Sequence, residues 1–293
     1  MSSISFAARS RLSDFNSQEI SNTVGSFAKL ALQNQPLLDA ISAESIARIT
    51  EISPSDLVGI AWAFAKCGCC DEPLLNAISA VSLPNMSLFE SQQLAGMAWA
   101  FAKLMVLDGT LLEAVSSAAR LRISELSALS LSRTVWAYAT LVVEVSPLID
   151  SIASESLLKL AAFTPQNLSL TAWSFARLQV CNEPLLSAIA SEAMPTLQAF
   201  KSQELANPAW SFAKLVVQHN PLRDAIAAEA IRTIKEWSPQ SLAATASAVA
   251  KLAFEHRPLW DAISAEARAN IREMGPQSFS TMAWALAKLI YED

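Results

Sequence analysis

The sequence of 293 residues contains only six glycines, four cysteines, two histidines and two tyrosines, and no run of 18 or more uninterrupted apolar residues. So few glycines argue against long flexible linkers and against a glycine-rich phosphate-binding loop. The cysteines and histidines do not have the paired spacing of a zinc site. Without a long apolar run, no membrane-spanning helix and no membrane partner are expected. What remains is a chain that is 52% hydrophobic with a net charge of −6.

A short peptide related to AWAFAKL recurs along the whole chain with a constant spacing of 37 residues. A strict period of this length predicts a solenoid, in which each repeat packs mainly on its neighbours. The position of the first Trp in this peptide is called the tryptophan column, and it is occupied by Gly25, Trp62, Trp99, Trp136, Trp173, Trp210, Ser247 and Trp284.

Each repeat is predicted to contain two helices. The first begins at turns such as SPSDL (53–57), TPQNL (164–168) and SPQSL (238–242), where Ser or Thr caps the helix and Pro takes its first position. The second opens with another proline, as in EPLLNAI (72–78) and NPLRDAI (220–226). No segment shows the two-residue alternation of a strand. The fold class is therefore all-α, an α-solenoid of stacked two-helix repeats.

The same register extends to both ends, so residues 1–293 are expected to form a single repeat array. Residues 1–15 align with 38–52 and are predicted to be most of a second helix, and residues 275–293 form the first helix of a truncated last unit. The array has about seven full units plus partial units at both ends, which suggests a fragment of a longer repeat protein.

One face of the first helix carries both the indole and a positive charge. At about 100° per residue, the cation four residues after Trp lies roughly 40° from it, whereas the Leu five before and the Phe two after lie on the opposite, packed side. This cation column consists of Lys29, Lys66, Lys103, Thr140, Arg177, Lys214, Lys251 and Lys288. Seven of its eight positions are basic, so we expect these seven to contact RNA phosphates.

A third position on that face varies while its neighbours stay constant. This variable column, three residues before the tryptophan column, contains Asn22, Gly59, Gly96, Arg133, Leu170, Asn207, Ala244 and Thr281. A constant cation beside a changing side chain is expected where a constant backbone is held and a changing base is read. Asn22, Arg133, Asn207 and Thr281 are the predicted base-reading residues. Arg133 is also expected to replace the cation missing at Thr140.

Structural explanations compete with this interpretation. The helix macrodipole alone favours basic residues in the last turn of a helix and acidic residues in the first turn of the next helix. The tryptophans Trp62, Trp99, Trp136, Trp173, Trp210 and Trp284 either stack on RNA or pack between repeats, and packing is the commoner role of such residues. Pro208 lies inside a predicted first helix and should kink it.

The repeats resemble the octotricopeptide class of organellar RNA-binding repeats and, because the period is 37, more closely the heptatricopeptide repeats. SPSDLVGIAWAFAKC (53–67), SQQLAGMAWAFAKLM (91–105) and ELANPAWSFAKL (204–215) carry the resemblance. It implies a superhelix that binds single-stranded RNA in mitochondria or plastids and acts in RNA processing, stability, translation or ribosome assembly. Other RNA-processing or ribosomal proteins are the further partners it implies.

No chemistry beyond binding is indicated. The CGCC cluster (67–70) and Cys181 are interpreted as packing or surface thiols, and no Ser/His/Asp arrangement or cofactor motif is present. Nothing corresponds to the nuclease-like domain that often follows such repeats, so we predict no enzyme activity, cofactor or metal. The alternative function is a protein-binding or structural α-solenoid scaffold without RNA contact, for which seven aligned cations have no obvious use.

Overall fold

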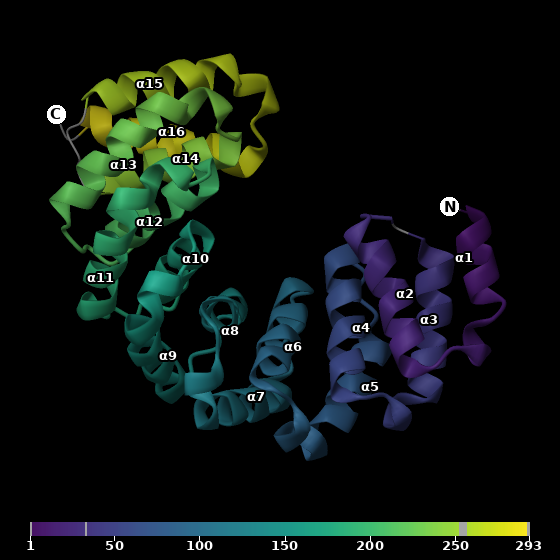
Figure 1. Cartoon of the computed structure of the whole chain (residues 1–293). Helices are drawn as coiled ribbons and strands as arrows, with labels where there is room; N and C mark the ends of the chain where they lie inside the picture. Colours follow the sequence, from purple (N-terminus) through teal and green to yellow (C-terminus); the bar gives the residue numbers. More distant parts are fainter. Residues whose placement is uncertain (1, 33, 252–256, 292–293) are drawn as a thin grey trace. The chain divides into compact units, whose positions relative to one another are not determined.

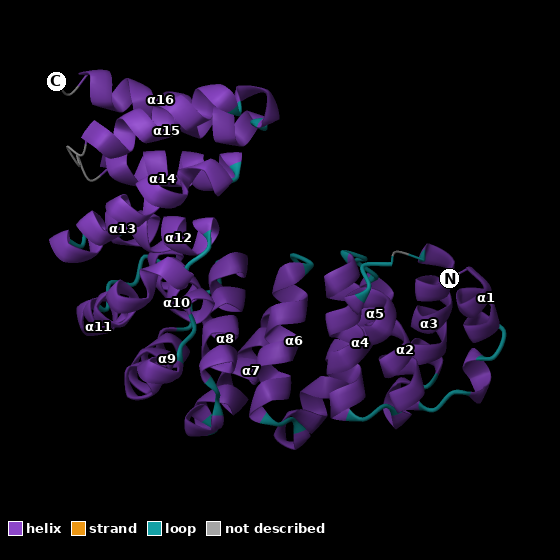
Figure 2. Ribbon diagram, turned by 45° about the horizontal axis from the view of Figure 1, so that its top comes forward, coloured by secondary structure: helices purple, strands orange, loops and turns teal. Residues whose placement is uncertain are grey.

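The computed structural model of the chain describes residues 2–32, 34–251 and 257–291. Those residues form sixteen α-helices and eight short 3₁₀ helices, with no strand among them (Figure 2). Neighbouring helices pack in a regular order that follows the 37-residue period. The predicted fold class, an α-solenoid of two-helix repeats, is therefore confirmed.

The first helices of the repeats are the even-numbered ones in Figure 1. They are α2 (Ser17–Lys29), α4 (Pro54–Cys67), α6 (Ser91–Lys103), α8 (Ala128–Leu141), α10 (Pro165–Arg177), α12 (Ser202–Lys214), α14 (Pro239–Lys251) and α16 (Pro276–Tyr291). The odd-numbered helices are the second helices. They are α1 (Ser2–Arg9), α3 (Gln35–Ala47), α5 (Glu72–Ser82), α7 (Gly109–Leu121), α9 (Ser146–Lys159), α11 (Glu183–Ala193), α13 (Asn220–Thr233) and α15 (Arg257–Ala269).

The caps that the sequence indicates begin the first helices. The Ser53 hydroxyl accepts the N–H of Asp56, and the Thr164 hydroxyl accepts that of Asn167, with a proline directly after each cap. These bonds satisfy backbone donors that would otherwise lack a partner. Pro208, in contrast, does not end its helix, because α12 is assigned as one helix from Ser202 to Lys214 with the proline inside it.

A 3₁₀ helix lies between each second helix and the next first helix, which the sequence analysis did not anticipate. They are η1 (Leu12–Asp14), η2 (Ile49–Glu51), η3 (Leu83–Leu88), η4 (Ile123–Glu125), η5 (Leu160–Ala162), η6 (Met194–Ala199), η7 (Ile234–Glu236) and η8 (Ile271–Glu273). An arginine before η2 connects this turn to the preceding repeat: Arg48 donates to the carbonyl of Phe15 at 2.7 Å. Arg122 makes the equivalent bond to the carbonyl of Phe89. These arginines therefore have a structural role.

The chain divides into two compact units, residues 1–152 and 153–293. In the first unit α2, α4, α6 and α8 pack side by side in that order, with α3, α5 and α7 as their second helices (Figure 1). In the second unit α10, α12, α14 and α16 do the same, with α11, α13 and α15 beside them. Each unit is thus a two-layered stack whose first helices make the closest contacts.

The core of each stack consists of columns of identical repeat positions. In the first helices the aromatic position two after the tryptophan column is buried at Phe27, Phe64, Phe101, Tyr138, Phe175 and Phe212. The buried hydroxyl of Tyr138 donates a hydrogen bond to the carbonyl of Leu112 at 2.5 Å. Burial raises the pKa of this phenol. The second helices contribute buried Leu and Ile such as Leu74 and Ile78.

The first helices end in a recurring left-handed residue. The chain has positive φ at Ala31, Gly68, Met105, Val142, Gln179 and Val216, always six residues after the tryptophan column. The following N–H reaches back to the aromatic core position, as from Val143 to the Tyr138 carbonyl at 2.9 Å, which is a Schellman motif. Glycine occupies the left-handed position in only one of these six turns.

We expect Val142→Gly to raise the free energy of unfolding by about 1 kcal/mol, because a β-branched residue with positive φ is strained and Gly is not. Val142 has φ 57° and its side chain is exposed, so little packing is lost. Chemical denaturation measures the change. Ala139→Gly, in the same helix with ordinary helical geometry, should instead lower stability by about 1 kcal/mol. Equal effects of the two substitutions would contradict the strain argument.

No helix among the described residues is long and apolar enough to cross a membrane.

Candidate functional site

The cation column lies on the surface at the end of successive first helices. Its members Lys29, Lys66, Lys103, Arg177 and Lys214 are exposed, and Lys288 is half-buried. Among the described residues, Lys29, Lys66, Lys103 and Lys214 form no ion pair. Lys251 ends α14, but its side chain lies outside the described residues. Five of the seven predicted phosphate-binding residues thus present positive charge to solvent.

Local structure fixes where these cations stand. Each occupies the last turn of its helix, just before the Schellman turn, where a cation is also stabilised by the helix macrodipole. Because the first helices of each unit pack side by side, the helix axes that carry neighbouring cations are expected to lie about 8–10 Å apart, the usual distance between packed helices. The first unit aligns Lys29, Lys66 and Lys103, and the second aligns Arg177 and Lys214.

Two glycines of the variable column bring the first helices of the first unit close together. A Cβ atom added at Gly59 would lie 2.3 Å from the Ser21 hydroxyl oxygen of α2, and one added at Gly96 would lie 2.8 Å from Cγ1 of Val58 in α4. These distances are far below van der Waals contact. The glycines therefore permit a tight approach of α2, α4 and α6, the helices that carry the first three cations.

The tryptophans lie between the cations and the helix interface. Trp62, Trp99, Trp136, Trp173 and Trp210 are half-buried, and the Trp99 and Trp136 rings are 6.4 Å apart between centroids with an angle of 32° between their planes. The guanidinium of Arg177 lies 5.8 Å from the centroid of the Trp173 ring. Lys288 stands at the same distance from Trp284. Indole and cation therefore share one face, and the indoles also pack between repeats.

Packing and RNA stacking by tryptophan predict different results for two substitutions. Trp99→Ala should lower the free energy of unfolding by about 2 kcal/mol, because Trp99 is half-buried against the next repeat. Trp284 is 45% exposed in the last first helix, so Trp284→Ala should cost less than about 1 kcal/mol. If Trp284 stacks on a base, the same change should weaken RNA binding by about 1–3 kcal/mol. Thermal or chemical unfolding, together with RNA titration, separates these effects.

The predicted base-reading residues are not equally available. Asn22 is exposed, whereas Arg133, Asn207 and Thr281 are half-buried. The Asn207 amide donates to the Ser169 hydroxyl of the preceding first helix at 3.1 Å, and the Thr281 hydroxyl donates to the Gln277 carbonyl of its own helix. The variable column thus lies at the contact between first helices. Base reading by these four residues stays a prediction.

The first helix that lacks a column cation, α8, buries two polar groups at least in part, Thr140 and Arg133. The Thr140 hydroxyl is buried and has no hydrogen-bond partner among the described residues. Arg133, two turns earlier, is half-buried, and this burial lowers the pKa of its guanidinium from the ordinary value. The guanidinium nevertheless remains charged at neutral pH, because an arginine side chain is not deprotonated in proteins under such conditions. Replacement of the missing charge by Arg133 stays a prediction.

Several acidic side chains of the second helices form ion pairs with basic residues close by in the sequence. Glu155 and Glu229 are buried carboxylates paired with Lys159 at 2.9 Å and Arg232 at 2.5 Å on the same helices. Glu44 makes a longer contact of 3.4 Å with Arg48. Lys159, Arg232 and Arg48 are thus committed to ion pairs, whereas Lys29, Lys66, Lys103 and Lys214 of the cation column form none among the described residues.

The cysteines and a cavity complete the inventory of polar sites. Cys67 is buried, Cys69 contacts the Gln35 amide, and Cys70 and Cys181 are exposed thiols. Within the described part of the chain, no three His, Cys, Asp or Glu side chains gather as metal ligands. The second unit also contains a cavity beside Arg223, which the sequence analysis missed. Its visible signal was NPLRDAI, where the equivalent segments of four other repeats have PLL or PLI.

The fold and this face define an α-solenoid repeat protein with a row of exposed cations. The family model for the RNA-editing substrate-binding complex 6 protein matches residues 2–147 and again residues 143–293. The chain therefore belongs to this family. Each match is about four repeats long, as expected when one model aligns twice with an array of equivalent units. The family is related in kind to the RNA-binding repeats that the sequence resembles, but it is not specifically the octotricopeptide or heptatricopeptide class.

None of the curated proteins compared with the chain matches it. Among solved structures, one similar chain comes from "Homology model of the full-length AP-3 complex in an intermediate open conformation", with a TM-score of 0.37 and 12% sequence identity. The match covers 93% of this chain and 48% of that one, so the chain spans about half the length of its structural relative.

Proposed function

We propose that the chain binds single-stranded RNA along the cation column and acts in an RNA-editing substrate-binding complex. The observation that carries the proposal is the column of exposed cations at the ends of five first helices, in a chain whose net charge is −6. Nucleic-acid affinity depends largely on phosphate neutralisation, so a local basic row is sufficient despite an acidic average. The description of the matching family supports the proposal that this binding takes place within an RNA-editing substrate-binding complex.

Sequence selectivity would come from the variable column beside the cations. Asn22 is the most available candidate because it is exposed, and the half-buried Arg133 and Thr281 lie in the same column. The half-buried indoles would present ring edges to bases while they hold the repeats together. We propose a mitochondrial or plastid location, as the resemblance to octotricopeptide and heptatricopeptide repeats implies. Binding without catalysis is the activity proposed.

A salt titration of binding to a random single-stranded RNA pool tests the proposal. With seven phosphate contacts, a plot of log affinity against log salt concentration should have a slope of about −5, because each contact to a single strand contributes roughly −0.7 to the slope. Filter binding or fluorescence anisotropy between 50 and 200 mM salt measures the slope. Absence of RNA binding at the lowest salt would show that the cations only complement the helix dipoles.

A scaffold function is the second candidate, and one observation favours it. The turns that follow the first helices expose large apolar side chains, namely Leu30, Met105, Leu107, Val142 and Val216, each at least 60% accessible. Exposed apolar side chains can mark protein contact sites. Pull-down with the intact chain, followed by RNase treatment, distinguishes the functions. Partners retained after RNase would favour the scaffold, and partners lost would favour RNA binding.

A further inference from the structure

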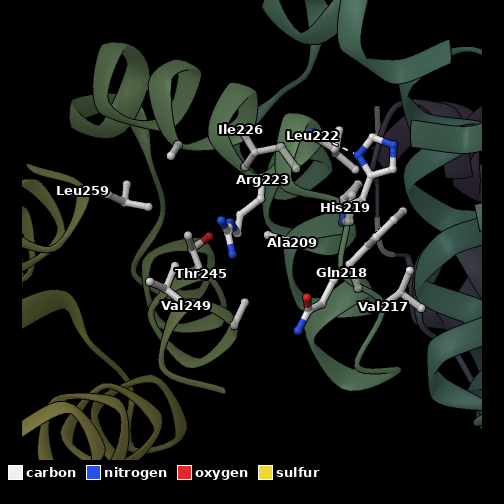
Figure 3. A pocket seen from close by; sticks show the side chains of 14 residues that line it. Ala209, Val217, Gln218, His219, Leu222, Arg223, Ile226, Thr245, Val249 and Leu259 are labelled. Carbon is white, nitrogen blue, oxygen red and sulfur yellow. Dashed lines mark hydrogen bonds between the residues drawn. The ribbon is translucent and has the colours of Figure 1, made fainter. Parts of the chain in front are cut away.

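A cavity in the second unit is built around a residue that breaks the repeat pattern. It lies among α12, α13, α14 and α15 and is partly open to solvent (Figure 3). Phe212, Ile226, Val249 and Leu259 provide apolar walls. Ligand sites in proteins commonly combine such walls with a few polar groups.

Arg223 supplies the charged group of this cavity. In five other repeats the same position is a buried core residue, namely Leu38, Leu75, Leu112, Ile149 and Leu186. Figure 3 shows the Arg223 side chain pointing toward Thr245 within the cavity. Its Nε also lies 3.6 Å from the Asp224 carboxylate, whose side chain is 62% exposed. The Arg223 side chain is 32% exposed, so its guanidinium borders both the solvent and the apolar walls of the cavity.

Thr245 contributes a second polar group to the cavity lining. Thr245 is only 1% exposed, and its hydroxyl forms no hydrogen bond with any described residue. The His219 ring borders the same space, and its Nδ1 accepts the Leu222 N–H at 3.1 Å. A neutral ring in this arrangement therefore carries its proton on Nε2 and can donate there. A guanidinium, a free hydroxyl and this ring surround an apolar interior.

We propose that this cavity binds a small apolar carboxylate, with its charge on Arg223 and its hydrocarbon part between Phe212, Ile226 and Val249. A guanidinium pairs with the planar carboxylate through two parallel hydrogen bonds. A phosphate is disfavoured because its larger charge would be desolvated by apolar walls around a single cation. The ligand is either a free small acid or the C-terminal residue of a partner chain. The site shares no residue with the cation column and does not depend on RNA binding.

Titration of the full chain with hexanoate, followed by ligand-observed NMR, tests the proposal. We expect saturable binding that is at least about tenfold weaker for neutral hexanol and for Arg223→Leu. Because Leu occupies this position in other repeats, Arg223→Leu should fold and melt no lower than the intact protein. Arg268→Leu removes an exposed charge from the neighbouring α15 and should bind hexanoate as the intact protein does. Equal binding by Arg223→Leu, or no saturable binding by the intact chain, would overturn the proposal.

A peptide series identifies the source of the carboxylate. The peptide Ser-Gly-Ser-Leu with a free C-terminus is compared with its C-terminal amide and with hexanoate. If the free peptide binds more tightly than hexanoate and the amide does not bind, the ligand is a partner's C-terminus. If hexanoate binds and neither peptide does, the ligand is a free small acid. Either result supports the site, whereas equal binding of the free peptide and its amide would contradict recognition of the carboxylate.

Discussion

Replacing all seven basic residues of the cation column by Gln should remove nearly all of the salt-dependent affinity for single-stranded RNA. With about seven contacts, affinity of the intact protein should fall roughly a thousandfold between 50 and 200 mM salt. The Gln variant should show a nearly flat dependence, and its affinity at 50 mM salt should already be weak. The substituted residues are Lys29, Lys66, Lys103, Arg177, Lys214, Lys251 and Lys288.

A matched variant separates this column from total charge. Seven other exposed basic residues lie outside it, and their replacement by Gln lowers the net charge by the same amount. They are Arg9, Arg120, Lys201, Lys235, Arg257, Arg268 and Arg272. This control should retain most of the affinity and a slope near that of the intact protein. If both variants lose affinity equally, RNA binding depends on net charge and the column is not a specific site.

Phe101→Ala should be among the most destabilising single substitutions in the chain, with a loss of about 3–5 kcal/mol in the free energy of unfolding. The side chain is 1% exposed, in a first helix that packs on two neighbouring first helices and on its own second helix. Such a loss is a large part of the roughly 5–15 kcal/mol that stabilises typical domains. Denaturant unfolding monitored by circular dichroism measures it.

Phe279→Ala provides the matched comparison. Phe279 is also on a first helix, but its side chain is 53% exposed, so its removal should cost less than about 1 kcal/mol. Hydrogen exchange of the Phe101 variant should show lost protection first in α6 and in its neighbours α4 and α8, because contacts in a repeat stack are local. Uniform loss of protection would show instead that the stack unfolds as one cooperative body.

The repeat fold could be predicted in detail because the same physical signals occur many times. Ser53 and Thr164 cap their helices as the sequence indicates, and the aromatic position exemplified by Phe101 is buried in each stack. Periodicity averages out the errors of any single repeat. The placement of Lys103 and Trp99 on one helix face follows from their spacing of four residues.

Features that depend on contacts between repeats could not be predicted. The 3₁₀ turns and the positive φ of Val142 have no distinctive residue, since five of six such turns lack glycine. The place of Pro208 inside α12, in contrast, follows from the repeat register. Asn207 is a candidate for base reading by position, yet only the structure shows that its amide contacts Ser169.

Gly59 and Gly96 leave room in the first unit for side chains of the preceding first helix, Ser21 and Val58, which a Cβ atom at either position would displace. In the second unit the same column contains Leu170 and Asn207, which fill this space with their own side chains. Side-chain volume at this one position of each repeat therefore bears directly on how neighbouring first helices pack. Exchange of a small residue for a larger one there would change the packing between repeats without altering any charge.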